Sequence, residues 1–190
     1  MEQNLFGQAY ASESVSGQLI TQLKGVEFSD SFIEILRTTE QRAVAYLRLY
    51  KEENLEEIQL QKFIQDVQQN AEQIPAFRTA RVNYVFDEIW LQKNKAVLLT
   101  MLVQELSAEV LENATLDYGP TIEIECHFLS RKLEFIYSIL ETTRPINQIL
   151  SNRSMRLIEA IGQMLHADIT FKTQNENKFV LSFRNCFNDV

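Results

Sequence analysis

Three glutamates stand about one helical turn apart, a spacing at which carboxylates can converge on a metal ion. Glu105, Glu109 and Glu112 would share one face of a helix predicted over residues 95–114. Protein metal sites join such carboxylates with histidines or further ligands, and this helix contains no histidine. The glutamates, together with Gln104, therefore predict a solvated acidic face on the outer side of the helix rather than a metal site.

The two histidines and two cysteines offer no recognisable reaction centre. His127 shares a strand face with Glu125, and His166 ends a helix, where a cation suits the negative end of the helix dipole. Cys126 and Cys186 lie in apolar, strand-like runs without the paired spacing of zinc or redox sites. No serine is flanked by the glycines of a nucleophile elbow. We therefore expect structural histidines, buried free thiols in a reducing compartment and no catalytic nucleophile.

The charge balance argues against nucleic acid and membranes as partners. The chain has 26 acidic and 18 basic residues, a formal net charge of −8, and no run of Lys and Arg that could release phosphate counterions. No segment approaches the roughly 18 apolar residues of a membrane span, and residues 1–11 lack the pattern of a signal peptide. These features favour a cytoplasmic protein. An acidic partner would have to meet Arg37, Arg42 and Arg48, which share one side of a predicted helix and could equally form a solvated face.

The N-terminal part of the chain has the periodicity of helices. Residues 1–27 are expected to hold a tail and a short helix capped by Ser12 or Ser14. Residues 31–50 and 54–74 each carry one apolar stripe, which predicts a helical hairpin. Because two such stripes leave further apolar surface exposed, a dimeric four-helix bundle would cover it. In the alternative, the short helix and the C-terminal part cover that surface in a monomer.

After Pro75 the pattern changes to alternating strands and helices. The expected elements are strand 82–90, helix 95–114, strands 121–129 and 132–140, helix 153–166, and strands 168–174 and 178–185. This order predicts an α+β fold in which two helices cover one face of a mixed sheet. The expected domains are a tail and short helix over 1–27, a dimerisation hairpin over 28–76 and an α/β sandwich over 77–190.

Two segments resemble the histidine-kinase-type ATPase domain, known as the Bergerat or GHKL fold. Residues 101–114, MLVQELSAEVLENA, are similar to the N-box helix of that domain. Residues 155–183 resemble its end, where a helix runs into a final hairpin. The expected hairpin over 28–76 occupies the place of the dimerisation and phosphotransfer helices of such kinases. The resemblance implies an ATPase-like sandwich preceded by a four-helix bundle in a homodimer.

The same resemblance identifies what the chain lacks for binding ATP. Glu109 replaces the N-box asparagine that ligates magnesium and adds negative charge beside Glu105. Residues 138–142 contain neither the Asp that contacts the adenine amino group in that domain nor the glycines that allow the backbone to approach closely. Residues 150–154 hold no glycine where a glycine-rich lid should cradle phosphates, so side chains would obstruct their approach. We expect a vestigial N-box at Glu105 and Glu109 and no cofactor.

The phosphoacceptor histidine of the resembling kinases is also missing, and Leu36 or Arg37 stands near its place. The resemblance then implies a non-catalytic adaptor, a pseudokinase of two-component signalling. Its partner would be a response-regulator receiver domain or a histidine kinase, bound through the hairpin side chains Arg37, Glu40, Gln41, Arg42 and Arg48. Two alternatives remain: an active histidine phosphotransferase in a phosphorelay, which needs no ATP site, and an adaptor outside two-component signalling.

Overall fold

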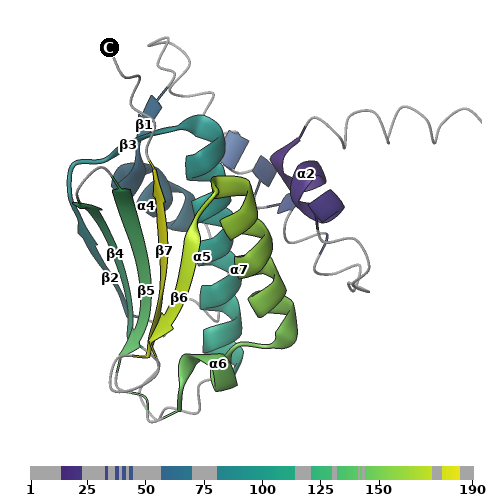
Figure 1. Cartoon of the computed structure of the whole chain (residues 1–190), viewed down its shortest axis with the longest axis vertical. Coiled ribbons are helices and arrows are strands. Elements are labelled where there is room, and N and C mark those ends of the chain that lie inside the picture. The colour runs from purple at the N-terminus through teal and green to yellow at the C-terminus, as the bar shows by residue number, and fades with distance from the viewer. Residues whose placement is uncertain are drawn as a thin grey trace, which may run out of the picture.

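Figure 1 shows the arrangement of the chain in a computed structural model. The structure describes residues 14–22, 33, 37, 38, 40, 41, 43, 44, 57–69, 81–113, 121–129, 132–140, 142, 144–172 and 177–184. Within these ranges, no helix combines the length and the apolar character that a membrane crossing requires.

A mixed five-stranded sheet forms one layer. Its strands, in spatial order, are β2 (Arg81–Phe86), β4 (Thr121–Leu129), β5 (Lys132–Leu140), β7 (Lys178–Arg184) and β6 (Asp168–Lys172). The pair β2–β4 is parallel, whereas the other neighbours are antiparallel. The expected mixed sheet is confirmed, and β4 and β5 have the bounds that the alternating sequence predicted.

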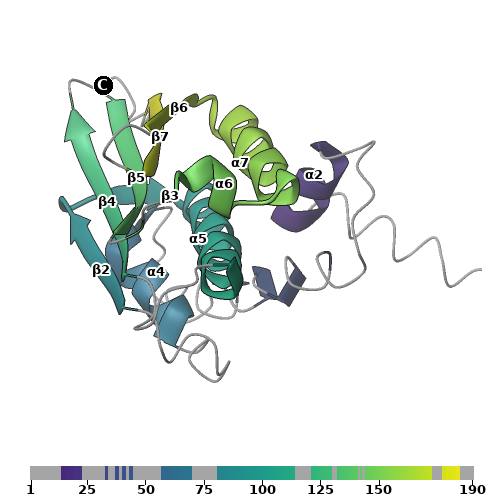
Figure 2. The same cartoon turned by 90° about the horizontal axis from the view of Figure 1, so that it is seen from below.

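Helices cover one face of this sheet. Figure 2 shows α4 (Leu60–Gln69), α5 (Lys93–Asn113) and α7 (Asn152–Leu165) on the same side of the strands, with α2 (Val15–Gln22) outside α7. The long helices α5 and α7 confirm the two that the sequence predicted over this face, and α4, which falls within the expected second hairpin helix, lies on the same side. The short helix α2 is capped as expected, because the Ser14 hydroxyl accepts a hydrogen bond from the Gly17 N–H at 2.9 Å.

The core lies between the sheet and these helices. Phe135 and Tyr137 of β5 and Leu102 of α5 are fully buried. In β4, buried residues alternate with partly exposed ones from Thr121 to His127, as expected of a strand with one covered face. On α7, Gly162 allows close contact with β6, since a Cβ atom there would lie 2.6 Å from Cδ1 of Ile169. This close packing fixes α7 against the edge of the sheet.

Two of the expected elements are wrong in extent. The expected strand 82–90 ends at Phe86, and β3 (Trp90–Gln92) leaves the sheet to pair with β1 (Glu57–Gln59). Residues 57–59 were expected to lie inside a helix. Ile58 has a helical position in the apolar stripe, but its backbone pairs with Leu91 instead, so a tertiary contact overrides the local pattern. The helix therefore begins at Leu60.

Only part of the expected hairpin lies within the described residues, so only that part can be compared with the prediction. Described residues at 33, 37, 38, 40, 41, 43 and 44 are helical, in agreement with the first hairpin helix. Most of that helix, the turn after it and the end of the second helix lie outside the described residues. The hairpin and the homodimer therefore remain predictions, as do the domain limits 1–27, 28–76 and 77–190.

Candidate functional site

Glu105 and Glu109, the glutamates of the expected N-box, are buried, which corrects the expected solvated face at these positions. Glu105 is 2% exposed, Glu109 is 4% exposed, and Gln104 before them is 6% exposed. The helical pattern gave these residues an outward position because they lie opposite the most apolar stripe of α5. In the folded chain, the segment that precedes α7 packs over this side of α5.

Glu109 forms the central contact of this region. Its Oε1 accepts a hydrogen bond from the backbone N–H of Ser151 at 2.7 Å. Ser151 is the N-cap of α7, and its hydroxyl in turn accepts a hydrogen bond from the Ser154 N–H. The N-terminus of a helix attracts anions because its first N–H groups lack intrahelical partners. A carboxylate from α5 therefore occupies the anion position at the start of α7.

A short helix, α6 (Ile146–Ile149), closes the space beside this contact, where the sequence had predicted only a loop. Its side chains Ile146 and Ile149 and the following Leu150 are 5% exposed or less. The Asn113 amide donates a hydrogen bond to the Ile149 carbonyl at 3.4 Å, which joins α6 to the end of α5. Apolar side chains and a direct backbone contact thus join the segment before α7 to α5. We call this region, residues 105, 109 and 145–154, the filled end.

An ion pair lies beside this contact, since Arg153 Nη2 is 4.0 Å from Oε2 of the buried Glu105.

Of the five hairpin side chains expected to be exposed to a partner, Glu40 is buried. It is 8% exposed, and its carboxylate accepts hydrogen bonds from the Val15 N–H at 2.6 Å and from the Ser16 hydroxyl. Glu40 thus binds the N-terminus of α2 and is unavailable to another protein. The other four divide into Arg37 and Gln41, which are exposed, and two that lie outside the described residues, Arg42 and Arg48.

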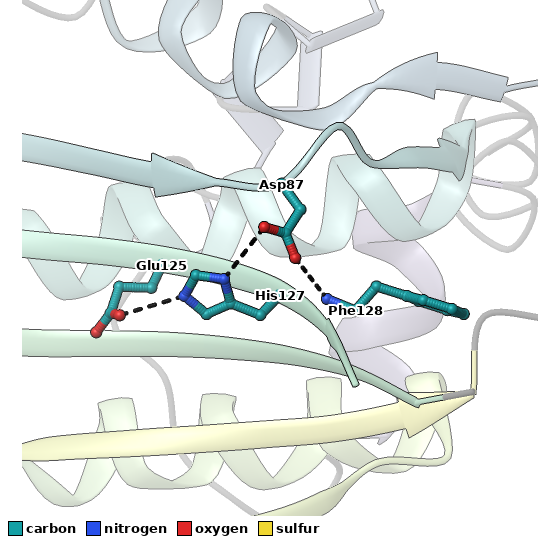
Figure 3. Close-up of polar contacts among 4 residues, drawn as sticks. All are labelled: Asp87, Glu125, His127 and Phe128. Carbon is teal, nitrogen blue, oxygen red and sulfur yellow. Dashed lines mark hydrogen bonds and ion pairs between the residues drawn. The ribbon is translucent and has the colours of Figure 1, made fainter. Parts of the chain in front are cut away.

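His127 lies between two carboxylates on the uncovered face of the sheet, as Figure 3 shows. Its Nδ1 is 3.5 Å from Asp87 Oδ1, and its Nε2 is 3.3 Å from Glu125 Oε2. The Phe128 N–H donates to Asp87 Oδ2 at 2.9 Å. That backbone hydrogen bond, with a smaller contribution from His127, holds the pKa of Asp87 below its ordinary value of 3.8. The contacts fasten the segment after β2 to β4.

The sequence had paired His127 with Glu125 but missed Asp87, which is 40 positions earlier in the chain. Only the parallel pairing of β2 with β4 brings Asp87 beside His127. No local signal predicts that contact. Among the described residues, no group of three His, Cys, Asp or Glu side chains has the geometry to hold a metal ion, and this cluster is no exception.

The other described candidate groups make contacts within the fold. His166 caps α7 in the left-handed conformation, with φ 52°, and its N–H donates to the Gln163 carbonyl at 3.1 Å. Burial raises the pKa of the Cys126 thiol above its ordinary value of 9.0, which keeps it protonated and a poor nucleophile. Burial also raises the pKa of Tyr137, whose hydroxyl lies 3.3 Å from that of Ser107. Cys186 lies outside the described residues.

No protein-family model matches the sequence, and no curated protein matches it. Solved structures do match the fold. The blue-light activated histidine kinase of Erythrobacter litoralis EL346 gives a TM-score of 0.65 at 14% identity, over 97% of this chain and 61% of that one. This chain thus spans less than two thirds of that kinase. The separate histidine kinase domain of the same protein gives 0.55 at 16% identity, over 93% and 94%.

A third similar structure is the histidine kinase AdeS of Acinetobacter baumannii, with a TM-score of 0.53 at 10% identity, over 96% of this chain and 98% of that one. The chain therefore has a histidine-kinase fold. The low identities leave its activity to be argued from its own side chains.

Proposed function

We propose that this chain is a non-catalytic signalling protein that keeps a histidine-kinase fold and works by binding a partner of two-component signalling. The observation that carries the proposal is the 2.7 Å hydrogen bond from the Ser151 N–H to Glu109. It places the chain's own carboxylate at the helix terminus where the resembling kinases bind phosphate. A site already filled from within has no need of a nucleotide to complete it.

Loss of phosphotransfer follows from the positions of the histidines. The sequence contains two, His127 and His166, and neither falls in the expected hairpin over 28–76. A phosphoryl group on His127 would lie beside Asp87 and Glu125 and would be repelled by both. His127 is therefore a poor acceptor. If the alternative function, a histidine phosphotransferase, were correct, His166 would have to accept the phosphoryl group.

The partner proposed is a response-regulator receiver domain or a histidine kinase. The similarity of fold to two histidine kinases supports this context. The binding surface would include the exposed side chains Arg37 and Gln41 of the hairpin, in a homodimer. Arg42 and Arg48 belong to the same proposed surface by their sequence positions.

A titration of the full chain against receiver domains and histidine kinases from the same cell tests this proposal. We expect one of them to bind, and we expect Arg37→Glu to weaken that complex by about tenfold, the loss of one good contact. Arg156→Glu is the matched control, because Arg156 is an exposed cation on α7. Incubation with a phosphorylated receiver domain should leave no label on the chain. Absence of any complex, or stable label on either histidine, would contradict the proposal.

A further inference from the structure

A cavity of about 400 Å³ opens at the other end of the sandwich from α6. In Figure 1 this is the upper end, where β5 and β6 begin, β7 ends and α7 turns into β6. It is lined by Lys95, Lys132, Met164, Leu165, His166, Asp168, Ser182, Phe183 and Arg184. We call it the basic cavity. Lys95 and Glu109 are separated by 14 residues of α5, or about 21 Å of helix, so the basic cavity is distinct from the filled end.

The charge of this cavity is opposite to that of the chain. Lys95, Lys132 and Arg184 contribute three cations, and Asp168 contributes the one carboxylate. Lys132 Nζ lies 3.1 Å from Asp168 Oδ2, so this carboxylate neutralises one of the three. An excess of about two positive charges remains, in a protein whose net charge is −8. Close cations repel one another, so such a cluster is best stabilised by an anion.

The end of α7 does not account for these cations. Two of its last carbonyls, those of Gln163 and Gly162, already accept hydrogen bonds from the N–H groups of His166 and Ala167, at 3.1 and 2.8 Å. They do not need a cation to cap them. Lys95 lies in the first turn of α5, whose N-terminus carries partial positive charge and adds to the attraction for an anion.

The wall of the cavity is apolar beneath this rim. Leu165 is 3% exposed and Phe183 is 1% exposed, and Met164 lies beside them. The Ser182 hydroxyl adds a neutral hydrogen-bonding group. Small-molecule sites are typically of this volume and combine apolar walls with a few polar groups that orient the ligand.

We propose that the basic cavity binds a phosphate monoester of a small organic molecule. A phosphate monoester carries a charge of about −1.5 to −2 near pH 7, which matches the excess of positive charge. The phosphate would contact Lys95 and Arg184, and the organic group would lie against the half-buried Met164, behind which Leu165 and Phe183 are packed. This inference does not depend on the proposed signalling function.

Calorimetric titration of the full chain with phenyl phosphate, inorganic phosphate and phenol tests the inference. We expect phenyl phosphate to bind with a dissociation constant of about 1 mM or below, and each of the other two about tenfold more weakly, because each lacks half of the recognised chemistry. Lys95→Ala and Arg184→Ala should each weaken phenyl phosphate binding about tenfold. Arg156→Ala, which removes an exposed cation elsewhere on α7, should leave it unchanged.

Arg184 is exposed and Lys95 is half-buried, so the variants should nearly keep the melting temperature of the unliganded protein. Absence of saturable phenyl phosphate binding up to about 10 mM would overturn the inference. So would binding that Lys95→Ala and Arg184→Ala leave intact, or that Arg156→Ala weakens equally. Equal affinity for inorganic phosphate and phenyl phosphate would also overturn it, since the apolar wall would then contribute nothing.

Discussion

The two ends of the sandwich carry side chains of opposite charge at the positions open to an anion. At the filled end, Glu109 contacts the N-terminus of α7, and apolar side chains of α6 close the space. At the other end, the basic cavity is open and carries cations such as Lys95 and Arg184. The comparison teaches that the fold does not fix where an anion can bind. The side chains placed at each end decide it.

The filled end is not the only helix start occupied in this way. Glu40 binds the N-terminus of α2 through the Val15 N–H, as Glu109 binds that of α7 through the Ser151 N–H. Both carboxylates are buried and come from distant parts of the chain. Each satisfies N–H groups that would otherwise lack a partner and meets the positive end of the helix dipole. Internal carboxylates thus replace external anions at two helix termini.

The largest loss of stability is expected from Ser151→Pro, which removes the backbone N–H that donates a hydrogen bond to Glu109. The backbone permits it, because Ser151 has φ −70° and Leu150 before it has ψ 135°, both suited to proline. Ser151→Ala is the matched control, since it removes the hydroxyl cap but keeps the N–H. We expect Ser151→Ala to lower the free energy of unfolding by about 1 kcal/mol. Ser151→Pro should lower it by about 2 kcal/mol more, the contribution of a hydrogen bond to a charged group.

Urea unfolding followed by circular dichroism would measure both variants. The account of the filled end fails if Ser151→Pro is no less stable than Ser151→Ala. Adding Glu109→Gln to each variant completes the test, because the extra loss from proline should shrink when the carboxylate charge is absent.

Glu40→Ala tests whether the second buried carboxylate has the same role. It removes the acceptor for the Val15 N–H and the Ser16 hydroxyl, and we expect a loss of about 2 kcal/mol in the free energy of unfolding. Glu40→Gln keeps one acceptor oxygen and should lose about half as much. The exposed neighbour offers a control, since Gln41→Ala should change stability by less than about 0.5 kcal/mol. Equal, small effects of Glu40→Ala and Gln41→Ala would contradict the burial of Glu40.

Asp87 provides a contrast with the buried Glu109 and Glu40, because it is an exposed carboxylate that also accepts a hydrogen bond from a backbone N–H. Its pKa lies below 3.8 in the folded protein, so its contribution to stability is complete above the unfolded pKa and is lost as the pH falls through the folded one. Asp87→Asn should therefore lower the melting temperature slightly at neutral pH. The difference from the unmodified protein should shrink as the pH falls through this lowered pKa. A difference that persisted or grew there would reverse the expected sign.

The smallest effect is expected at the basic cavity. Lys132 and Asp168 form an ion pair at 3.1 Å, but both side chains are exposed to solvent, at 48% and 79%. Lys132→Ala should change the free energy of unfolding by about 0.5 kcal/mol or less, because exposed pairs contribute little. A loss as large as that of Ser151→Pro would show that the cavity is a structural element, and the contrast between the two ends would disappear.

The sequence predicted the sandwich well because its signals are local. The alternating runs of β4 and β5 and the apolar stripe of α5 depend on spacing within each element. The errors all depend on distant contacts. Ile58 pairs with Leu91, and Asp87 reaches His127 only through the pairing of β2 with β4.

The candidate site shows the same limit. The resemblance singled out Glu105 and Glu109 as part of an expected N-box, but the helical pattern assigned them to the solvated side of α5. Their burial depends on the segment over 145–154, whose position against α5 has no signature within either segment. The basic cavity collects residues from α5, α7 and three strands, and no spacing in the sequence joins them.

The central claim is that the Glu109 carboxylate leaves no place for a nucleotide at the filled end. Isothermal titration calorimetry of the full chain with ATP and magnesium tests it most directly. The account predicts no saturable binding at the filled end up to about 1 mM ATP, and the same result for Lys95→Ala, which removes a cation of the basic cavity. A dissociation constant of about 100 µM or tighter, retained by Lys95→Ala and abolished by Glu109→Ala, would contradict it.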